Sequence, residues 1–358
     1  MNHVNDQTIP GAQDNPIRPF SAPPKAHVIS LFSGGLDSSL AVLLMLRQNV
    51  QVTALTFMTH FGCDLSDRSS CSSNPYPAAK QFGFDVKLVH LADKFVQIVQ
   101  NPKYGYGKNM NPCVDCRLLM LREAKDYMEM VGADVVITGE VLGQRPFSQM
   151  RPKLHLTERE SGLKGRLLRP LSAKLLPPTI TELDGRIDRE KLESISGRGR
   201  HRQFELAREF GLEDYPTPAS GCLLTDPEYS KKLRDLLELT PHINFIDLNL
   251  LQVGRHFRLT PTTKVIVGRS ESDNNKIEAY AEPADWLLEV MDTGSPVTIV
   301  RGSPTEDDLE KAAAITARYC DLRAEPAVEV TLRRPQETRT LRLPAGSPEW
   351  VESLRISK

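Results

Sequence analysis

A short glycine motif between two apolar segments constrains the fold of this chain most. Residues 33–39 read Ser-Gly-Gly-Leu-Asp-Ser-Ser, after the apolar run 27–32 and before an apolar stretch at 40–46. A strand that turns through paired glycines into a helix can bind phosphate, because Gly34 and Gly35 lack a Cβ and let the backbone approach an anion closely. The first turn of the helix adds unpaired N–H groups and the positive end of its dipole. We therefore expect a phosphate loop at this position.

The side chains of the motif add to this expected site. Ser33, Ser38 and Ser39 supply hydroxyl donors, and Asp37 is placed to hold a magnesium ion or an attacking group. An ordinary glycine turn is the alternative, but Ser-Gly-Gly-x-Asp-Ser between a strand and a helix is much more specific than a lone glycine pair. The motif resembles the PP-loop of the N-type ATP pyrophosphatases. This resemblance implies cleavage of ATP to AMP and pyrophosphate, with adenylation of a substrate oxygen.

From residue 27 onward, strand-like runs alternate with helical patterns. The expected strands are 28–32, 51–58, 85–91 and 134–138, and the expected helices are 38–47, 77–82, 93–100 and 113–131. Such alternation predicts parallel crossovers and therefore a doubly wound α/β sheet, with ligands at the carboxyl ends of its strands. The glycine loop follows the first strand, where this rule puts a ligand. The PP-loop resemblance implies a HUP-like version of the same fold.

The pattern also divides the 358-residue chain into parts. Residues 1–26 are rich in Pro, Asn and Gln and lack the apolar core of a signal peptide, so we expect a disordered tail. A PP-loop domain is expected over 27–240. A separate α+β domain is expected over 245–340, with strands at 265–268, 297–300 and 328–332 and an amphipathic helix at 305–320.

Composition excludes several classes of protein. A formal net charge of -1 excludes a strongly basic protein, so binding of nucleic acid would need a local patch. No apolar run reaches the roughly 20 residues that span a bilayer, and we expect a cytoplasmic protein that makes no contact with a membrane. Six cysteines in a chain of this size do not indicate a disulfide scaffold. Their clustering indicates chemistry or metal binding instead.

Two of the cysteines open a helix. Asn111 is a good N-cap and Pro112 a good first helical residue for the helix expected at 113–131. Cys113 and Cys116 then fall in the first turn, three residues apart and roughly on one side. The end of the dipole stabilises a thiolate, so we expect both sulfurs to be good nucleophiles or metal ligands.

A third cysteine, Cys222, lies in a loop rich in Pro and Gly. Two cysteines one turn apart and a distant third are typical of a four-iron–four-sulfur cluster with one open iron. Zinc is the competing metal, with His201 as a fourth ligand, although a structural zinc usually takes four protein ligands. Cys63 and Cys71 flank a polar segment that we interpret as a loop over the active site, with a redox pair or second metal site as alternatives. Cys320 is expected in a core.

The order of these motifs carries a second resemblance. A PP-loop, Asn-Pro-x-x-x-Cys at a helix start, Thr138-Gly139-Glu140 and a late Gly-Cys resemble the tRNA thiolation enzymes over roughly residues 27–235. The resemblance implies ATP-dependent adenylation of a uridine or cytidine oxygen in tRNA and its replacement by sulfur. Sulfide or a sulfur-carrier protein would be the donor. Residues 140–146 depart from the His-containing segment of the thiouridylases, which leaves the modified tRNA position open.

The resemblance leaves two routes for sulfur. In the thiouridylases that use a persulfide, the cysteines matching Cys116 and Cys222 form the catalytic pair. In the iron–sulfur branch, a CxxC and a later cysteine hold the cluster, and Cys113 supplies the extra ligand here. Both routes remain open. Weaker candidates for contacts to substrate or nucleotide follow the fourth strand, and they are Gln144, Arg145 and Gln149.

Arginines beyond glycine turns mark the C-terminal part. Arg255 and Arg269 follow Val-Gly pairs, and Arg301 follows the strand at 297–300. Such arginines can contact phosphates, although solvated surface charges are the simpler interpretation. Val-Gly-Arg with Asn274, then Gly-Ser-Pro-Val, a helix and a strand resemble the NFACT RNA-binding domain. That family has a His where this chain has Pro296.

Together these patterns predict an ATP-dependent tRNA sulfurtransferase with an RNA-binding domain. One rival is a PP-loop ligase of the amidotransferase type that acts on a small molecule and has no need of Cys222. The other is a non-catalytic RNA-binding protein that senses nucleotide. The oligomeric state stays open.

Overall fold

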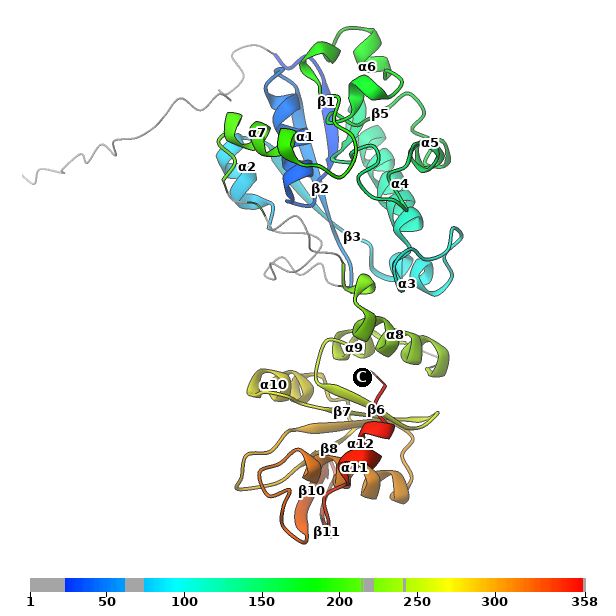
Figure 1. Cartoon of the computed structure of the whole chain (residues 1–358), viewed down its shortest axis with the longest axis vertical. Helices are drawn as coiled ribbons and strands as arrows, with labels where there is room; N and C mark the ends of the chain where they lie inside the picture. The colour runs from blue at the N-terminus through cyan, green and yellow to red at the C-terminus, as the bar shows by residue number, and fades with distance from the viewer. Residues whose placement is uncertain (1–22, 62–73, 214, 216–221, 241–242, 357–358) are drawn as a thin grey trace, which may run out of the picture. The chain divides into compact units, whose positions relative to one another are not determined.

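The computed structural model describes residues 23–61, 74–213, 215, 222–240 and 243–356. The chain divides into two compact units, residues 1–222 and 223–358 (Figure 1). The sequence places the end of the first domain near residue 240, whereas the structure places helix α8 (Pro227–Leu239) in the second unit. No helix within the described ranges is both long enough and apolar enough to cross a membrane.

A parallel sheet forms the centre of the first unit. Its strand order is β3-β2-β1-β4-β5, and all four pairings are parallel. The strands are β1 (His27–Leu31), β2 (Gln51–Met58), β3 (Asp85–His90), β4 (Val135–Thr138) and β5 (Leu167–Leu168). The α/β fold expected from the alternating pattern is confirmed.

Helices cover both faces of this sheet. Figure 1 shows α1, α2 and α7 on one face and α3, α4 and α5 on the other. Every residue of α1 except Asp37 is buried, because the helix packs between the sheet and α7. The helices of this unit are α1 (Leu36–Leu46), α2 (Tyr76–Phe82), α3 (Ala92–Gln100), α4 (Cys113–Val131), α5 (Arg151–Glu160), α6 (Ile180–Leu183) and α7 (His201–Glu209), with short 3-10 turns η1 (Ala173–Leu175) and η2 (Arg189–Lys191).

Most of the expected N-terminal tail lies outside the described residues. Its last residues are ordered against the sheet. The backbone N–H of Lys25 donates to the carbonyl of Asn49 at 3.0 Å, and Ala26 is buried. The ordered chain therefore extends to the N-terminal side of β1.

The second unit is built on an antiparallel sheet of order β11-β10-β8-β9-β7-β6. Helix α11 packs on this sheet through Leu309, Ala313 and Ala317, and Cys320 lies in the same core, as expected. The strands are β6 (Arg255–Thr260), β7 (Thr263–Val267), β8 (Trp286–Glu289), β9 (Thr298–Gly302), β10 (Val328–Arg334) and β11 (Glu337–Leu343). The helices are η3 (Leu223–Thr225), α8, α9 (Phe245–Leu250), α10 (Glu271–Tyr280), α11 (Glu306–Arg318) and α12 (Pro348–Ser353).

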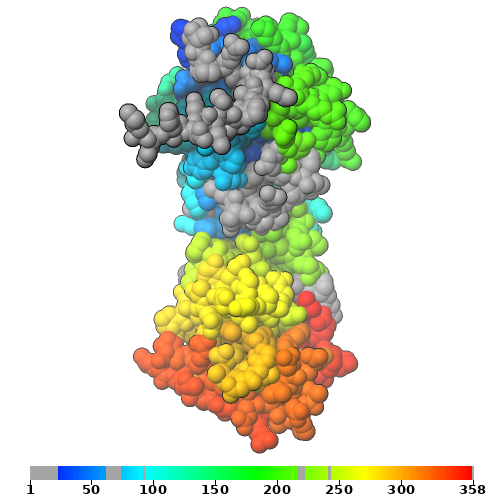
Figure 2. All heavy atoms as spheres, turned by 90° about the vertical axis from the view of Figure 1, so that its left-hand side faces the viewer, coloured from blue at the N-terminus to red at the C-terminus, as the bar shows by residue number. Residues whose placement is uncertain are grey.

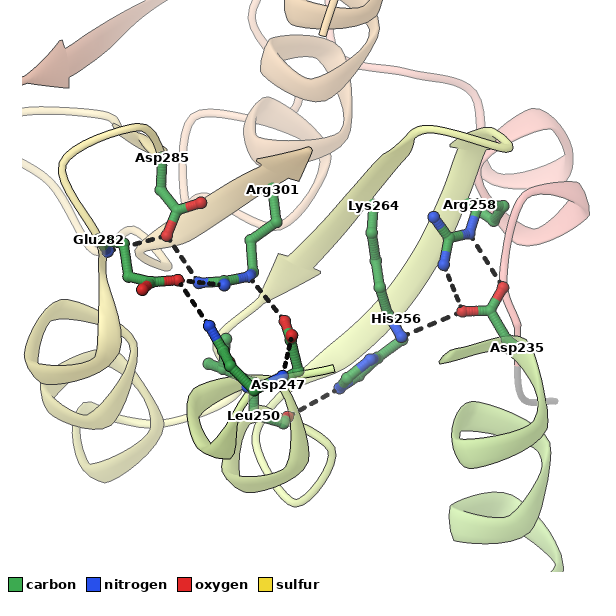
Figure 3. A network of polar contacts seen from close by, with 10 residues as sticks. Asp235, Asp247, Leu250, His256, Arg258, Lys264, Glu282, Asp285 and Arg301 are labelled. Atoms are coloured by element: carbon green, nitrogen blue, oxygen red, sulfur yellow. Dashed lines mark hydrogen bonds and ion pairs between the residues drawn. The ribbon is translucent and has the colours of Figure 1, made fainter. Parts of the chain in front are cut away.

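A polar network near α9 surrounds one of the arginines that follow turns in the sequence. Arg301, which the sequence leaves open as a phosphate contact or a solvated surface charge, is instead paired with three carboxylates (Figure 3). Its guanidinium lies 3.1 Å from Asp247, 2.5 Å from Glu282 and 2.7 Å from Asp285. The side chain is only 13% exposed. A cation already neutralised in this way stabilises the fold and has no free face for an anion.

The same figure shows a second group around a buried histidine. Asp235 of α8 pairs with Arg258 at 2.6 Å and with Lys264 at 3.0 Å (Figure 3). His256 is fully buried and its Nε2 lies 2.8 Å from the carbonyl of Val253. Burial, and then the nearby lysine charges, hold the pKa of His256 well below its usual value. These contacts fix α8 to the C-terminal sheet.

Candidate active site

The glycine motif forms the turn between β1 and α1, at the carboxyl end of the central strand. Gly34 has a φ of 71°, a left-handed conformation that glycine adopts without strain. Gly35 is the N-cap of α1, and no side chain caps this end. The backbone N–H groups of the first turn therefore lack a side-chain acceptor, which is the arrangement that receives an anion.

Serine hydroxyls hold the loop in shape. The Ser38 hydroxyl donates to the carbonyl of Gly35 at 2.9 Å and lies 3.2 Å from the Ser33 hydroxyl. Ser33 is exposed, whereas Ser38 and Ser39 are buried. Ser33 is thus the serine of the motif whose side chain faces solvent, and Ser38 acts at least partly by bracing the turn.

Asp37 has one fixed and one unpartnered oxygen. Its Oδ2 accepts a hydrogen bond of 2.7 Å from Nε2 of Gln144. Its Oδ1 is buried and has no hydrogen-bond partner among the described residues. A buried carboxylate oxygen without a partner is costly unless a ligand completes it. The residues present therefore fit a magnesium ion at this position, because hard cations prefer carboxylate oxygens.

Gln144 belongs to a small group of glutamines beyond β4. Gln203, at the start of α7, donates from Nε2 to Oε1 of Gln144 at 3.4 Å. Gln149 is buried, and its side-chain oxygen has no partner within the described part of the chain. Of the weaker candidates, Gln144 contacts Asp37 of the PP-loop directly, whereas Arg145 is exposed. The backbone carbonyl of Gln149 accepts a hydrogen bond of 2.8 Å from the N–H of Gly143.

Gly139 packs directly against the PP-loop. A Cβ at this position would lie 2.5 Å from the backbone nitrogen of Ser38 and 2.6 Å from the carbonyl carbon of Asp37. Only glycine leaves room for this contact. The Thr-Gly-Glu segment after β4 and the start of α1 therefore form one continuous edge at the carboxyl ends of β1 and β4.

Glu140, the next residue, is a further functional candidate. The sequence places it in the Thr-Gly-Glu motif but does not indicate what its carboxylate does. It is almost fully buried and bridges two arginines, with 3.1 Å from Oε1 to Nε of Arg117 and 3.1 Å from Oε2 to Nε of Arg169. Burial alone would raise the pKa of Glu140, but the two arginines outweigh burial and lower it. Because Arg117 directly follows Cys116, this carboxylate fixes a positive charge beside the CxxC turn.

The cysteine helix differs in one detail from the expectation. Pro112, not Asn111, is the N-cap of α4, and no side chain caps this end. Cys113 is the first helical residue, so both cysteines lie in the first turn as expected. Asp115 links this turn to the preceding loop. Its carboxylate accepts hydrogen bonds from the backbone N–H groups of Lys103 and Tyr104 at 3.2 and 3.0 Å.

The expected activation of Cys113 by the helix end is wrong in this structure. Burial raises the pKa of the Cys113 thiol, and the charges of Arg145 and Arg117 offset only part of that rise. Desolvation disfavours the charged form of an acid more than the dipole and two arginines favour it. Burial thus works against the helix end at Cys113 and favours the thiol over the thiolate.

The described cysteines are not gathered as a metal site. Within the described ranges, no three His, Cys, Asp or Glu side chains come together in a way that could hold a metal. Cys113, Cys116, Cys222 and His201 are all described, so neither the cluster nor the zinc site is assembled. Cys63 and Cys71 lie outside the described residues. The three cysteines Cys113, Cys116 and Cys222 are chemically suited to an iron–sulfur cluster, and the cluster stays a prediction.

Comparisons with known proteins match the two units separately. Residues 24–176 match the family model described as Thiamine biosynthesis protein (ThiI). Residues 254–351 match the model described as NFACT protein RNA binding domain. A tRNA-specific 2-thiouridylase MnmA of Pelotomaculum thermopropionicum is 22% identical over 346 residues, covering 86% of this chain and 87% of its own length. The protein of that name from Methylobacterium nodulans is 25% identical over 363 residues, covering 88% of each chain.

A solved structure described as a 4-thiouridine synthetase–RNA complex with bound ATP shares 18% identity with this chain. It covers 52% of each chain, with a TM-score of 0.33. The sequence matches bear on both resemblances drawn above from the motifs. They confirm that the first unit resembles the PP-loop domain of tRNA thiolation enzymes and that the second resembles the NFACT RNA-binding domain.

Proposed function

We propose that this chain is an ATP-dependent tRNA sulfurtransferase. It adenylates a base oxygen of tRNA, with release of pyrophosphate, and then exchanges the AMP-bearing oxygen for sulfur. The observation that carries this proposal is the joint presence of two matched segments on one chain, a PP-loop segment and an RNA-binding segment. Relatives named tRNA thiouridylases, aligned over 86% and 88% of the chain, support the same reaction.

The PP-loop would bind the triphosphate. Backbone N–H groups at Gly34, Gly35 and the first turn of α1, with the exposed Ser33 hydroxyl, would hold the pyrophosphate part. Asp37 would hold Mg²⁺, which neutralises charge that develops on the phosphates when the bond to AMP breaks. Ser38 would keep the loop in shape through its hydrogen bond to the carbonyl of Gly35, and the buried Ser39 follows it in the first turn of α1.

The cysteines would carry the sulfur. In the persulfide route, the terminal sulfur of a persulfide on one member of the pair Cys116 and Cys222 attacks the adenylated carbon, and AMP leaves with the oxygen. The thiolate of the second member then attacks the sulfur of the first, which releases the thiolated base and forms a disulfide. A thiol reductant restores the pair with two electrons. A sulfur-carrier protein would donate the outer sulfur of its own persulfide to the restored thiol. Sulfide would instead open the disulfide directly, in place of the reductant, which leaves a persulfide on one cysteine and a thiolate on the other.

The alternative is the four-iron–four-sulfur cluster on Cys113, Cys116 and Cys222. Within the described ranges, these side chains are not gathered as a metal site. The two routes separate on one residue, since the persulfide route tolerates loss of Cys113 and the cluster does not. A cytoplasmic location stays a prediction from the sequence.

The test is mass spectrometry of tRNA nucleosides from a strain that lacks the gene, complemented with cysteine variants. We expect one thionucleoside to disappear and to return with the wild type and with Cys320→Ala, which removes only a core cysteine. Cys116→Ala and Cys222→Ala should not restore it. Unchanged thionucleosides in the deletion strain would refute the proposal. Iron analysis after anaerobic purification and the activity of Cys113→Ala then distinguish the two routes.

A further inference from the structure

The C-terminal unit contains a hollow of about 520 Å³ that we call the arginine pocket. Four arginines line it, and they come from three separate parts of the chain. Arg255 begins β6, Arg269 follows β7, Arg318 ends α11, and Arg323 lies in the turn after that helix. Figure 2 shows the face on which α10 lies, where its yellow surface borders the orange surface of later segments of the same unit. The fold thus gathers positive charge in a chain whose net charge is close to zero.

The motif that resembles the NFACT domain builds the wall of this pocket. Asn274 donates from Nδ2 to the carbonyl of Ser295 at 3.4 Å, and its Oδ1 accepts from the backbone N–H of Val297 at 3.0 Å. A Cβ on Gly268 would lie 2.0 Å from that same Oδ1, so only glycine fits there. Gly268 and Asn274 therefore tie the two loops of the motif together on either side of the hollow.

The charges in the pocket are only partly compensated. Arg269 pairs with Asp273 at 2.7 Å. Arg255 lies over the ring of Tyr319, 4.6 Å from its centroid, and donates to the carbonyl of Gly268 at 3.4 Å. Among the described residues, no ion pair joins Arg255, Arg318 or Arg323 to a carboxylate.

Two acidic residues, Glu271 and Asp321, also line the hollow, against four arginines. The arginines therefore outnumber the acids in a concave site. Like charges gathered in this way repel one another unless an anion binds between them.

We propose that the arginine pocket binds a phosphate of the RNA backbone. This inference rests on the proposed function, because it takes tRNA as the partner. Guanidinium groups bind phosphate through paired, charge-assisted hydrogen bonds. The one aromatic ring in the pocket is already covered by Arg255, so the site offers charge and not a surface on which a base stacks. Such contacts position RNA without reading its sequence. All lining residues fall within the segment matched by the RNA-binding model.

The experiment measures the tRNA dissociation constant of the full chain as a function of salt. The double variant Arg318→Ala, Arg323→Ala removes the two pocket arginines at the end of α11 and in the turn after it. The matched control is Arg333→Ala, Arg334→Ala, which removes the same charge from β10, where both arginines pair with glutamates. Each lost phosphate contact should lower the salt slope by about one and weaken binding roughly tenfold at low salt. The control should bind like the wild type.

Equal tRNA affinity and salt slope in the wild type and the pocket variant would overturn this inference, even if the variant has lost affinity for free ATP or inorganic phosphate. A melting curve for each variant shows whether the C-terminal unit remains folded, and Arg318→Lys, Arg323→Lys should restore part of the binding if the fold suffers in the alanine variant. Thiolation at saturating tRNA is measured in parallel. If the wild type forms no thionucleoside but its tRNA binding depends on the pocket, the proposed function fails and the pocket stands.

Discussion

Gln144 donates a hydrogen bond of 2.7 Å to Oδ2 of Asp37, which lies 107 positions earlier in the chain. The bond joins the segment after β4 to the first turn of α1 and holds the carboxylate in one orientation. Its second oxygen, Oδ1, is then buried and unpartnered within the described residues. A carboxylate held by one oxygen and open at the other is arranged to bind a cation when nucleotide enters.

Asp37→Asn should lower pyrophosphate release about 100-fold or more, because the amide keeps the size of the side chain but loses the charge that holds Mg²⁺. Ser33→Ala should cause a smaller loss, since backbone N–H groups share the phosphate contacts. Both variants should unfold at the wild-type temperature, because neither side chain packs in the core. Wild-type pyrophosphate release by Asp37→Asn in the presence of tRNA would show that this loop is not the ATP site.

Gln144→Ala should raise the Mg²⁺ concentration needed for half-maximal activity, because it frees the carboxylate of Asp37 to rotate. The effect on the rate at saturating Mg²⁺ should be about tenfold, since a hydrogen bond to a charged group contributes about 1.5 kcal/mol or more. Gln81→Ala is a suitable control, since Gln81 of α2 also donates to a distant carbonyl, that of Gly211. An unchanged Mg²⁺ requirement in Gln144→Ala would separate this glutamine from the site.

Much of the first unit was predictable because its elements are strongly apolar. Strand β2 has six consecutive buried residues, and α1 is buried on all sides, so hydrophobic runs alone mark them. The edge strands β6 and β11 were missed. Both strands are rich in charged and polar residues, and β11 has no buried residue, so no apolar run marks them.

The site was predictable only where its residues are neighbours in sequence. Ser33 to Ser39 and the CxxC turn each form one short segment, and their type and spacing indicate their chemistry. The partners of Glu140 are 23 and 29 positions away, and only the fold brings Arg117 and Arg169 to it. The ion pairs of Arg301 could not be predicted for the same reason. Three acids distant in sequence surround it, so its exposure could not be read from the turn on which it lies.

Glu140→Gln should destabilise the first unit by about 3 kcal/mol, because the buried charge of Arg169 then keeps only its longer contact of 3.6 Å with Glu158. The arginines lower the pKa of Glu140 in the folded state below the ordinary carboxyl value of 4.5. The ion pairs of Glu140 therefore stabilise the fold fully above pH 4.5. This stabilisation is lost as the pH falls through the pKa of the folded state. Chemical denaturation between pH 7 and pH 3 measures this. The variant should lose stability less steeply than the wild type below pH 4.5, and parallel curves would contradict the assigned ion pair.

Arg301→Ala should unfold the C-terminal unit more easily, by about 3 kcal/mol, because Asp247, Glu282 and Asp285 lose their common partner. Arg333 provides the control, because its ion pairs with Glu278 and Glu289 are partly exposed to solvent. Arg333→Ala should lower the free energy of unfolding by less than about 1 kcal/mol. Denaturant unfolding followed by a C-terminal tryptophan, Trp286 or Trp350, reports on this unit. A stable Arg301→Ala variant with a selective loss of tRNA binding would return Arg301 to the role of a phosphate ligand.

The coupling of ATP cleavage to sulfur transfer tests the central claim most directly. Purified full-length protein is incubated with unmodified tRNA, ATP, Mg²⁺ and a sulfide donor, and pyrophosphate and thionucleosides are quantified in the same samples. We predict that pyrophosphate release depends on tRNA, that thionucleoside forms in proportion to it, and that Asp37→Asn abolishes both. Pyrophosphate release that is independent of tRNA, with no thionucleoside formed, would contradict the account.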